Sequence, residues 1–402
     1  MIKIGVIGYG YVGKALANRL SVFYDVICYD CDKNKFKDPK SEKRLLLTNN
    51  PDSLMECNIF IVTVQTPIDN DGNPNLEFIL GATKLVSKYL SKGDIIIYES
   101  TVYPGVTEQI CGRLIEKSTG LKLNDDFYLA YSPERISPGD EEHHIDNIAK
   151  IVAVSDNLAL EKVKEIYSMV TQERLFVADS IMEAEAAKLL ENLQRDTNIA
   201  LMNEYTSVMQ KLGINIMKVI DAANSKWNFN YYLPGFVGGH CIGVDTHYYI
   251  KIARELNLEP KMALTTREVN EAAITHISDI VINHLNNMKN KKVCIAGIAY
   301  KKNIDDIRNS ASLKVASELV KRGYEVLLFD PLINKITNKD KKIKLCNFND
   351  IIDISVLICL VYHDVFDNFR FSNTMFKDPG RAIVIDPYNK LLNLRKYNLF
   401  VF

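Results

Sequence analysis

The chain has 402 residues, of which 47% are hydrophobic and 25% charged, values typical of a protein with a full core and two or three domains. Its 49 lysines and arginines nearly balance 50 aspartates and glutamates, which excludes a global positive field that attracts nucleic acid or anionic lipid. Eight cysteines in so long a chain form no disulfide framework, and the apolar runs are too short to span a bilayer, so we expect a reduced, cytoplasmic protein without membrane insertion.

Residues 1–178 alternate between short β-branched runs, such as "KIGVIG" at 3–8 and "DVICYD" at 25–30, and helical patterns. This alternation predicts a mostly parallel sheet with crossover helices, a doubly wound α/β domain. Cys28 and Cys31 form a C-x-x-C pair, but no second pair or nearby histidine completes a zinc site. We therefore expect no metal.

The glycine-rich loop "GYGYVG" follows the first predicted strand and opens the first helix. Gly8 permits the tight turn, and Gly10 lets a pyrophosphate approach the backbone. Gly13 allows the helix and the strand to pack closely. In this context the loop predicts a dinucleotide site rather than a plain turn.

The end of the second predicted strand indicates which dinucleotide binds. Asp30 can accept hydrogen bonds from both ribose hydroxyls and would repel a 2′-phosphate, which favours NAD over NADP. Lys33 and Lys35 lie nearby and weaken that preference. We predict NAD as the cofactor.

From residue 179 the pattern changes to one continuous helix. Ser180 and Glu183 form a capping box at its start, and Gly213 provides its stop. At 1.5 Å per residue the helix is about 50 Å long, more than a small domain needs to cover itself. We expect a helix shared between domains or between subunits.

One face of this helix carries Lys188, Asn192 and Arg195 at i, i+4 and i+7. A solvated stripe is the ordinary interpretation of such a pattern. The alanine- and leucine-rich neighbours instead indicate a helix packed on several sides, where a partly desolvated lysine can serve as an acid/base or an oxyanion partner. The helix alone leaves both interpretations open.

Cys241 lies among glycines in "PGFVGGHCIGVDTHYY", so a ligand atom could reach its sulfur. The helical pattern at 244–257 would aim its N-terminus at the thiol and stabilise a thiolate. The alternative is a small residue in a tight loop. Beside an NAD site, an accessible thiol suggests that an alcohol is oxidised to an aldehyde, captured as a hemithioacetal, oxidised to a thioester and hydrolysed.

From about residue 291 the order of strand, glycine turn, helix and strand returns, with Asp330 at the position that Asp30 has in the first domain. The sequence thus predicts two Rossmann-like domains joined by a helical middle domain. We predict the boundaries 1–178 for the NAD-binding domain, 179–290 for the middle domain and 291–402 for the C-terminal domain.

Seven motifs in order carry a family resemblance: "GYGYVG", "QTP" at 65–67, "ESTVYPG" at 99–105, "YSPERISPGD" at 131–140, "KLLENLQRD" at 188–196, "GGHCIGVD" at 238–245 and "GIAYKKNIDDIRNS" at 297–310. Over essentially its whole length the chain resembles the UDP-glucose and UDP-N-acetylmannosamine dehydrogenase family. That family oxidises the sugar C6 alcohol to the acid with two NAD, through a thiol intermediate. The resemblance implies that the C-terminal domain binds UDP.

The resemblance also implies site residues. The nucleophile would be Cys241, the acid/base Lys188 and its partner at the oxyanion Asn192. Asp245 and Glu134 would be the carboxylates that position water, and Thr101 would lie beside the nicotinamide. The cofactor contacts would be Gly8, Gly10, Tyr11, Val12, Gly13, Asp30, Thr66, Thr101 and Arg308. The substrate contacts would be Glu134, Arg135, Ile136, Lys188, Asn192, Arg195, Gly238, Tyr300 and Lys301.

The substrate branch follows from two loops. "GGHCIGVD" is similar to the branch that acts on UDP-N-acetylhexosamines, and "SKWNF" at 225–229 resembles its N-acetylglucosamine and N-acetylgalactosamine members. The resemblance implies a homodimer through the central helix and a role in polysaccharide biosynthesis. UDP-glucose and UDP-N-acetylmannosamine are alternative substrates. A two-electron hydroxyacid dehydrogenase and a non-catalytic dinucleotide sensor are alternative functions, which the number of NADH formed per sugar separates.

The sequence departs from the family pattern at Gln65, before Thr66, and at Ala311, after Ser310, where a proline is usual. Both positions lie beside expected cofactor contacts, so the loop geometry there is open. His240 precedes the thiol and could act as its base. Because adjacent loop residues usually point apart, we interpret His240 as structural or substrate-shaping.

Overall fold

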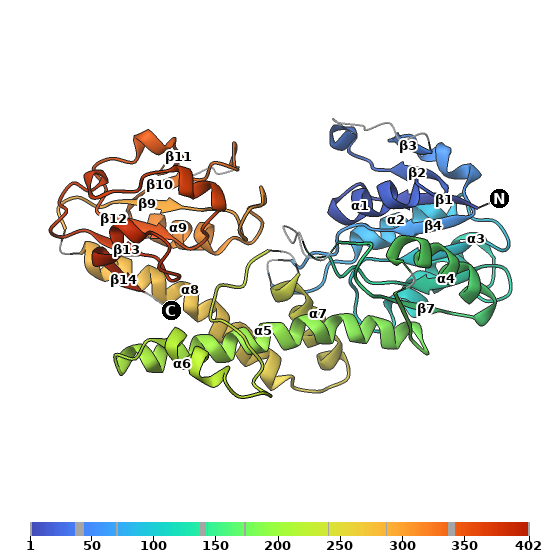
Figure 1. Cartoon of the computed structure of the whole chain (residues 1–402). Helices are drawn as coiled ribbons and strands as arrows, with labels where there is room; N and C mark the ends of the chain where they lie inside the picture. The colour runs from blue at the N-terminus through green and yellow to red at the C-terminus, as the bar shows by residue number, and fades with distance from the viewer. Residues whose placement is uncertain are drawn as a thin grey trace. The chain divides into compact units, whose positions relative to one another are not determined.

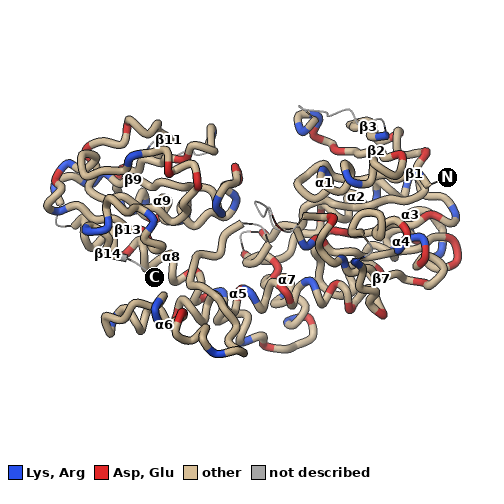
Figure 2. The backbone as a smooth tube through the Cα atoms, in the orientation of Figure 1, with Lys and Arg blue, Asp and Glu red and all other residues tan. Residues whose placement is uncertain are grey.

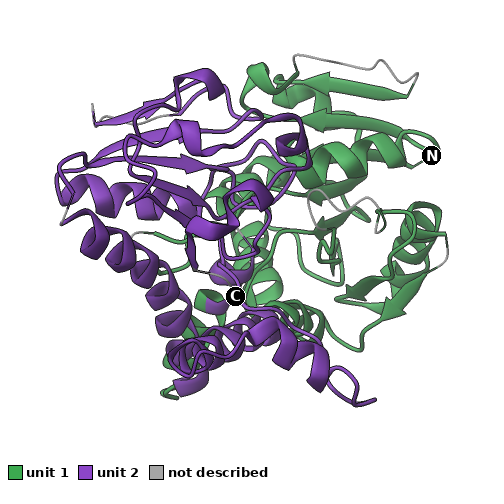
Figure 3. Cartoon of the chain, turned by 60° about the vertical axis from the view of Figure 1, so that its left-hand side comes forward, with its two compact units in different colours: residues 1–192, 247–259 green, residues 193–246, 260–402 purple. Residues whose placement is uncertain are grey.

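The computed structural model describes residues 2–36, 44–69, 71–136, 142, 144–172, 174–239, 241–286, 288–336 and 342–400. The chain forms two compact units, and each combines two segments (Figure 3): Met1–Asn192 with His247–Glu259, and Leu193–Thr246 with Pro260–Phe402. Acidic and basic residues are interspersed along the chain, as the balanced composition predicts (Figure 2). Within the described ranges, every helix is too short or too polar to cross a membrane.

The first unit is built on an eight-stranded sheet in the order β3-β2-β1-β4-β5-β6-β7-β8 (Figure 1). Its strands are β1 Lys3–Ile7, β2 Asp25–Tyr29, β3 Leu45–Thr48, β4 Ile59–Val62, β5 Ile95–Tyr98, β6 Tyr128–Tyr131, β7 Lys150–Val154 and β8 Leu175–Val177. Its helices are α1 Tyr11–Leu20, α2 Glu77–Ser87, α3 Arg113–Thr119 and α4 Asn157–Thr171, with 3-10 turns η1 Lys33–Phe36 and η2 Pro51–Glu56 and a π-helical turn η3 Val106–Gly112.

The pairing in this sheet is parallel except between β6 and β7, which run antiparallel. Strands β4 and β5 are buried at every position, because helices cover both faces of a parallel sheet. The sequence predicts β1, β2, β4, β5 and β6 but not β3, β7 and β8. Strands β3 and β8 contain no buried residue, and no described helix separates β6 from β7, so these three strands lack the alternation of buried strand and helix.

The second unit contains a six-stranded, all-parallel sheet in the order β11-β10-β9-β12-β13-β14. Its strands are β9 Lys292–Ala296, β10 Glu325–Phe329, β11 Ile343–Leu345, β12 Val356–Cys359, β13 Ile383–Ile385 and β14 Asn398–Phe400. Its helices are α6 Ile216–Ala223, α8 Lys261–Leu285 and α9 Ala311–Lys321, with 3-10 turns η4 Phe348–Asp350, η5 Asp364–Asn368, η6 Asn373–Met375 and η7 Leu392–Tyr397. Apolar residues of α8, α9 and the sheet form one core.

Two helices, α5 Ile181–Lys211 and α7 Ile242–Glu255, contribute to both units, because the division falls inside each of them. Helix α5 is the predicted long helix and measures about 46 Å. The Ser180 Oγ accepts a hydrogen bond from the Glu183 N–H at 3.2 Å, as the capping box predicts. Gly213 ends the helix with φ +69°, while the Ile214 N–H donates to the Met209 carbonyl at 2.9 Å. The α/β fold with two Rossmann-like sheets is confirmed.

Candidate functional site

The glycine loop of the first unit has the geometry that a dinucleotide requires. Gly8 has φ +106°, and α1 begins directly after Gly10. A Cβ on Gly13 would lie 1.8 Å from the Gly8 carbonyl oxygen, so only glycine allows this approach of helix to strand. By contrast, a Cβ on Gly10 would have no described atom within 4 Å. The loop therefore leaves its backbone open where a pyrophosphate would approach, and it fits NAD. Tyr11 is exposed and Val12 half-buried.

Asp30 lies at the end of β2 and is only 4% exposed. Its carboxylate accepts hydrogen bonds from the Tyr9 N–H at 2.8 Å, the Asp32 N–H at 2.9 Å and the Lys35 ammonium at 2.7 Å. Burial raises the pKa of this carboxyl, but these donors outweigh burial and hold the pKa below its ordinary value. Asp30 is thus ionised, and a ribose would share it with Lys35.

Three predicted site residues follow neighbouring parallel strands. Thr66 comes after β4, Thr101 after β5 and Glu134 after β6, and all three are half-buried. The carboxyl ends of parallel strands share one edge of a sheet, and the β1/β4 neighbourhood is the topological switch point of this sheet. The Ser100 Oγ donates to the Val64 carbonyl at 2.6 Å and ties two of these loops together. The predicted cofactor and catalytic loops of the first unit are therefore neighbours.

Lys188 is 9% exposed, so its position on α5 is not part of a solvated stripe. Its Nζ donates to the backbone carbonyl of Glu134 at 2.8 Å. The Glu134 Oε1 accepts the N–H groups of Arg135 at 2.6 Å and Ile136 at 2.5 Å. The structure therefore brings Lys188, the predicted acid/base, into contact with the backbone of Glu134, the predicted water-positioning residue.

The remaining residues of these two motifs have different surroundings. The Arg135 guanidinium forms an ion pair with Glu191 of α5 and donates to the Ala149 carbonyl at 3.1 Å. Asn192 is half-buried, whereas Arg195 is exposed. The face predicted from the i, i+4, i+7 spacing is thus buried at one end and solvated at the other.

In the second unit, Cys241 directly precedes helix α7. Its carbonyl accepts the Asp245 N–H at 2.8 Å, so the thiol residue is the N-cap of this helix, which begins two residues before the predicted pattern at 244–257. Cys241 is half-buried, whereas Cys28, Cys294 and Cys359 are fully buried in the core, where burial raises the pKa of each thiol. Asp245, in the first turn of α7, is 2% exposed. His240 lies outside the described residues.

The glycines before Cys241 contact protein groups. A Cβ on Gly239, which has φ +78°, would lie 2.6 Å from the Tyr300 ring, and one on Gly238 would lie 2.9 Å from the Asn309 carbonyl oxygen. The Asn309 side chain also donates to the Gly239 carbonyl at 2.9 Å. The sequence interpretation assigns these glycines to ligand access. In the structure, their lack of side chains lets the segment from 297 to 310 pack on the thiol loop.

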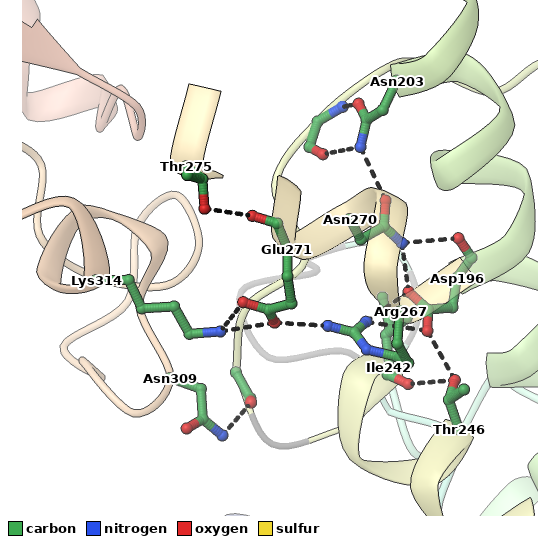
Figure 4. Close-up of polar contacts among 12 residues, drawn as sticks. Asp196, Asn203, Ile242, Thr246, Arg267, Asn270, Glu271, Thr275, Asn309 and Lys314 are labelled. Carbon is green, nitrogen blue, oxygen red and sulfur yellow. Dashed lines mark hydrogen bonds and ion pairs between the residues drawn. The ribbon is translucent and has the colours of Figure 1, made fainter. Parts of the chain in front are cut away.

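A polar network that the sequence analysis missed supports the first turns of α7 (Figure 4). The Asp196 carboxylate is fully buried and accepts from the Thr246 hydroxyl at 2.7 Å, the Arg267 guanidinium at 2.8 Å and the Asn270 amide at 2.7 Å. Arg267 also pairs with Glu271 at 2.8 Å. The network joins α5, α7 and α8. In the sequence only the aspartate of "LQRD", Asp196, points to this network, because the residues that bind Asp196 are distant from it in the chain.

The same network reaches α9 of the C-terminal sheet. The Lys314 ammonium pairs with Glu271 at 2.8 Å, and Arg267 lies against Gly243, where a Cβ would be 3.1 Å from its Nη1. The Asn203 side chain donates to the Gly235 carbonyl at 2.9 Å. The backbone on both sides of Cys241 is therefore held by fixed polar groups.

The predicted phosphate contacts lie in the loop between β9 and α9. Tyr300 and Lys301 are half-buried, and Arg308 forms an ion pair with Asp306 at 2.5 Å. Ala311 is the first residue of α9, where proline is favoured but not required, and Ser310 is the N-cap. Gln65 is exposed. The departure at Ala311 therefore leaves the start of the helix intact.

Family models for three domains match the chain in order. They are the NAD binding domain of the UDP-glucose/GDP-mannose dehydrogenase family at residues 37–171, its central domain at 182–272 and its UDP binding domain at 294–392.

Known proteins are similar over most of the chain. A UDP-N-acetyl-D-glucosamine 6-dehydrogenase of Pseudomonas aeruginosa is 37% identical over 83% of each chain, and Protein CapL of Staphylococcus aureus is 36% identical over 96% of this chain and 95% of its own. The solved structure of a UDP-D-ManNAc dehydrogenase from Pyrococcus horikoshii is similar with a TM-score of 0.82 and 28% identity, covering 96% of this chain and 95% of that one. The chain belongs to the UDP-glucose/GDP-mannose dehydrogenase family and is an NAD-dependent oxidoreductase of the UDP-sugar dehydrogenase class.

Proposed function

We propose that this enzyme oxidises the C6 hydroxyl of a UDP-N-acetylhexosamine to a carboxylate in two steps on one thiol. The balanced reaction converts R–CH2OH, two NAD⁺ and one water into R–COO⁻, two NADH and three protons. NAD, when bound, accepts a hydride in each oxidation. Cys241 holds the sugar as a hemithioacetal between the two oxidations and as a thioester from the second oxidation until hydrolysis.

The packing of the 297–310 segment on the thiol loop carries this proposal. Tyr300 and Asn309 contact Gly238 and Gly239, immediately before the thiol, within one unit. A UDP group held by Tyr300 and Lys301 would therefore be anchored beside Cys241. Binding energy from the nucleotide can then be used to position the distant C6 atom.

Each proposed step uses a residue of this chain. Lys188 accepts the C6 hydroxyl proton, and its ammonium then stabilises the oxyanion together with Asn192. The Cys241 thiolate adds to the aldehyde carbon, and it leaves again when water attacks the thioester. Asp245 and Glu134 orient that water, and Glu134 takes its proton. The Asn192 amide and the Lys188 ammonium are both hydrogen-bond donors, as an oxyanion requires.

An N-acetylglucosamine or N-acetylgalactosamine substrate is the finer part of the proposal. The "GGHCIGVD" and "SKWNF" loops support it. Relatives from Pseudomonas aeruginosa and Salmonella typhi, named UDP-N-acetyl-D-glucosamine 6-dehydrogenases, are 37% and 38% identical, and archaeal proteins named UDP-N-acetyl-D-mannosamine dehydrogenases are 29–32% identical. UDP-glucose and UDP-ManNAc are the alternative substrates.

A parallel assay tests the substrate assignment. NADH formation is followed with UDP-GlcNAc, UDP-GalNAc, UDP-ManNAc and UDP-glucose at equal concentrations. We expect the highest kcat/KM with UDP-GlcNAc or UDP-GalNAc. A higher kcat/KM with UDP-glucose or UDP-ManNAc would overturn the assignment, while the family membership would stand.

We further propose a homodimer through the central helix. Helix α5 exposes Leu201, Tyr205 and Val208 at i, i+4 and i+7, and the exposed Leu212 follows directly after its last residue, so one face is apolar and solvent-exposed in the single chain. Trp227 is 91% exposed. An apolar stripe of this kind is typical of a surface that a second chain covers.

The proposed division into three parts is 1–178 for NAD, 179–290 for catalysis and 291–402 for UDP. Each family-domain match falls inside one of these parts. A cytoplasmic location and a role in polysaccharide biosynthesis remain part of the proposal. The mechanism requires Cys241 in the reduced form, which a reducing compartment maintains.

A further inference from the structure

Lys150, the first residue of β7, is completely buried in the first unit. Its ammonium contacts the Glu99 carboxylate at 2.5 Å and the carbonyls of Ser132 at 3.4 Å and Pro133 at 3.3 Å. It lies 3.7 Å from the Glu134 Oε2. All four groups belong to segments that follow β5 and β6 at the predicted catalytic edge.

Glu99, directly after β5, is held from two sides. Lys150 contacts its Oε2, and the hydroxyl of Tyr167 in α4 donates to its Oε1 at 2.5 Å. The Lys150 ammonium also lies 5.3 Å from the centre of the Tyr167 ring. Burial raises the pKa of Glu99 to about 7, and Lys150 opposes this effect. The position of the lysine is therefore fixed by partners on β5, β6 and α4.

The Glu134 carboxylate has two different oxygens. Its Oε1 accepts two backbone N–H groups, whereas its Oε2 is buried and accepts no hydrogen bond from any described residue. Lys150 is the cation paired with Oε2, and it also binds the two carbonyls before Glu134. A cation at this distance stabilises the negative charge of a buried carboxylate oxygen.

We propose that Lys150, held by Glu99 and Tyr167, is a positioning residue that fixes the Glu134 carboxylate for thioester hydrolysis. This inference rests on the proposed role of Glu134. Lys150 orients the carboxylate and supplies its counter-charge without touching the sugar or the cofactor. Its loss slows hydrolysis more than the preceding oxidations, so the thioester on Cys241 accumulates.

A double variant that removes both charges of the Lys150–Glu99 pair separates the positioning role of Lys150 from its contribution to folding stability. Lys150→Met leaves Glu99 buried without its cation, and we expect a lower Tm. Lys150→Met/Glu99→Gln replaces the pair by neutral groups of similar volume, and we expect a Tm near that of the wild type. Lys164→Met removes a half-buried lysine of α4 that pairs with Glu161 at 2.8 Å, and it serves as the control.

Activity is measured with UDP-GlcNAc at saturating NAD. For the double variant we expect kcat to fall about 10- to 100-fold, the range that misplacing a catalytic group produces. The apparent KM should fall as well, because the thioester accumulates when its hydrolysis is the slow step. Intact-protein mass spectrometry during turnover is expected to show the sugar thioester on Cys241. Lys164→Met is expected to keep the wild-type kcat. If the folded double variant has the wild-type kcat, Lys150 has only a structural role and the inference is overturned.

Glu134→Gln distinguishes the two levels of the argument. If Glu134→Gln turns over at the wild-type rate, the proposed role of Glu134 fails, and the inference falls with it. If Glu134→Gln is slow while the double variant is fast, only the role of Lys150 fails. Should Lys150→Met aggregate, the double variant still decides between these outcomes.

Discussion

Cys241 has surroundings that no other described cysteine shares. It caps α7 and is half-buried, whereas Cys346, also half-buried in the second unit, has a pKa that burial raises to about 11. A helix N-terminus stabilises a thiolate, and a thiolate is the nucleophile that the mechanism needs. These surroundings support the proposed role of Cys241 as the nucleophile.

Replacing Cys241 by serine tests this assignment. A serine hydroxyl is a far weaker nucleophile than a thiolate, so we expect Cys241→Ser to lose turnover by at least about a thousandfold. NAD binding, followed by fluorescence titration with NADH, should be unchanged. Cys346→Ser is the matched control and should keep full activity. Undiminished acid formation by Cys241→Ser would contradict the thioester mechanism.

Gly239 is constrained twice, by φ +78° and by the Tyr300 ring. Gly323 has φ +93° in the same unit, but no described atom lies within 4 Å of its Cβ position. Gly323→Ala should therefore cost about 1–2 kcal/mol of stability through backbone strain alone. Gly239→Ala should in addition raise the KM for the UDP-sugar, because Tyr300 must move. The KM for the UDP-sugar and the free energy of unfolding are measured for both variants. Equal KM values would refute the inference that Gly239 must lack a side chain for Tyr300 to pack against it.

At the scale of elements, the sequence predicts the long helix, its caps and the buried strands, because each has a continuous local pattern. It misses β7, which begins with Lys150, a buried lysine whose partners come from three other segments. It assigns the glycines near Cys241 to ligand access, because their contacts with Tyr300 and Asn309 join residues about 60 to 70 positions apart. Long-range packing is the part that a single sequence does not contain.

Helix α5 also carries a buried titrating group near its start. Glu185 accepts the N–H groups of Gly105 at 2.6 Å and Thr107 at 2.9 Å, and burial raises its pKa from 4.5 to about 7. The folded protein thus holds a proton that the unfolded chain releases at lower pH. The stability linked to this group is present below about pH 4.5 and is lost as the pH rises through about 7.

Glu185→Gln should remove this pH dependence. Relative to the wild type, the free energy of unfolding of the variant should increase between pH 5 and pH 7.5, by up to about 1.4 kcal/mol per pH unit. Urea unfolding at the two pH values measures the change. Glu183→Gln, an exposed position on the same helix, should follow the wild type. A constant difference between Glu185→Gln and the wild type at both pH values would contradict the assignment.

At the scale of the whole molecule, the composition predicts several domains, and the returning α/β alternation predicts two Rossmann-like sheets. The sequence does not reveal that the two compact units divide inside α5 and α7, because a continuous helix carries no mark of such a division. The proposed dimer rests on the exposed face of α5.

The dimer proposal has a direct test. We expect light scattering to give twice the mass of one 45.7 kDa chain. Val208→Glu, in the middle of the apolar stripe of α5, should shift the protein toward the monomer, because the interface would have to bury a charge. Leu158→Glu, at an exposed leucine on α4, should leave the mass unchanged. A monomeric wild type would refute the proposal.

The central claim is a four-electron oxidation on one thiol, and the ratio of products tests it most directly. NADH is measured by absorbance and the UDP-uronic acid by chromatography in the same reaction with UDP-GlcNAc or UDP-GalNAc. We predict two NADH for each acid formed, with no aldehyde released. One NADH for each oxidised sugar, or accumulation of the aldehyde, would contradict the account.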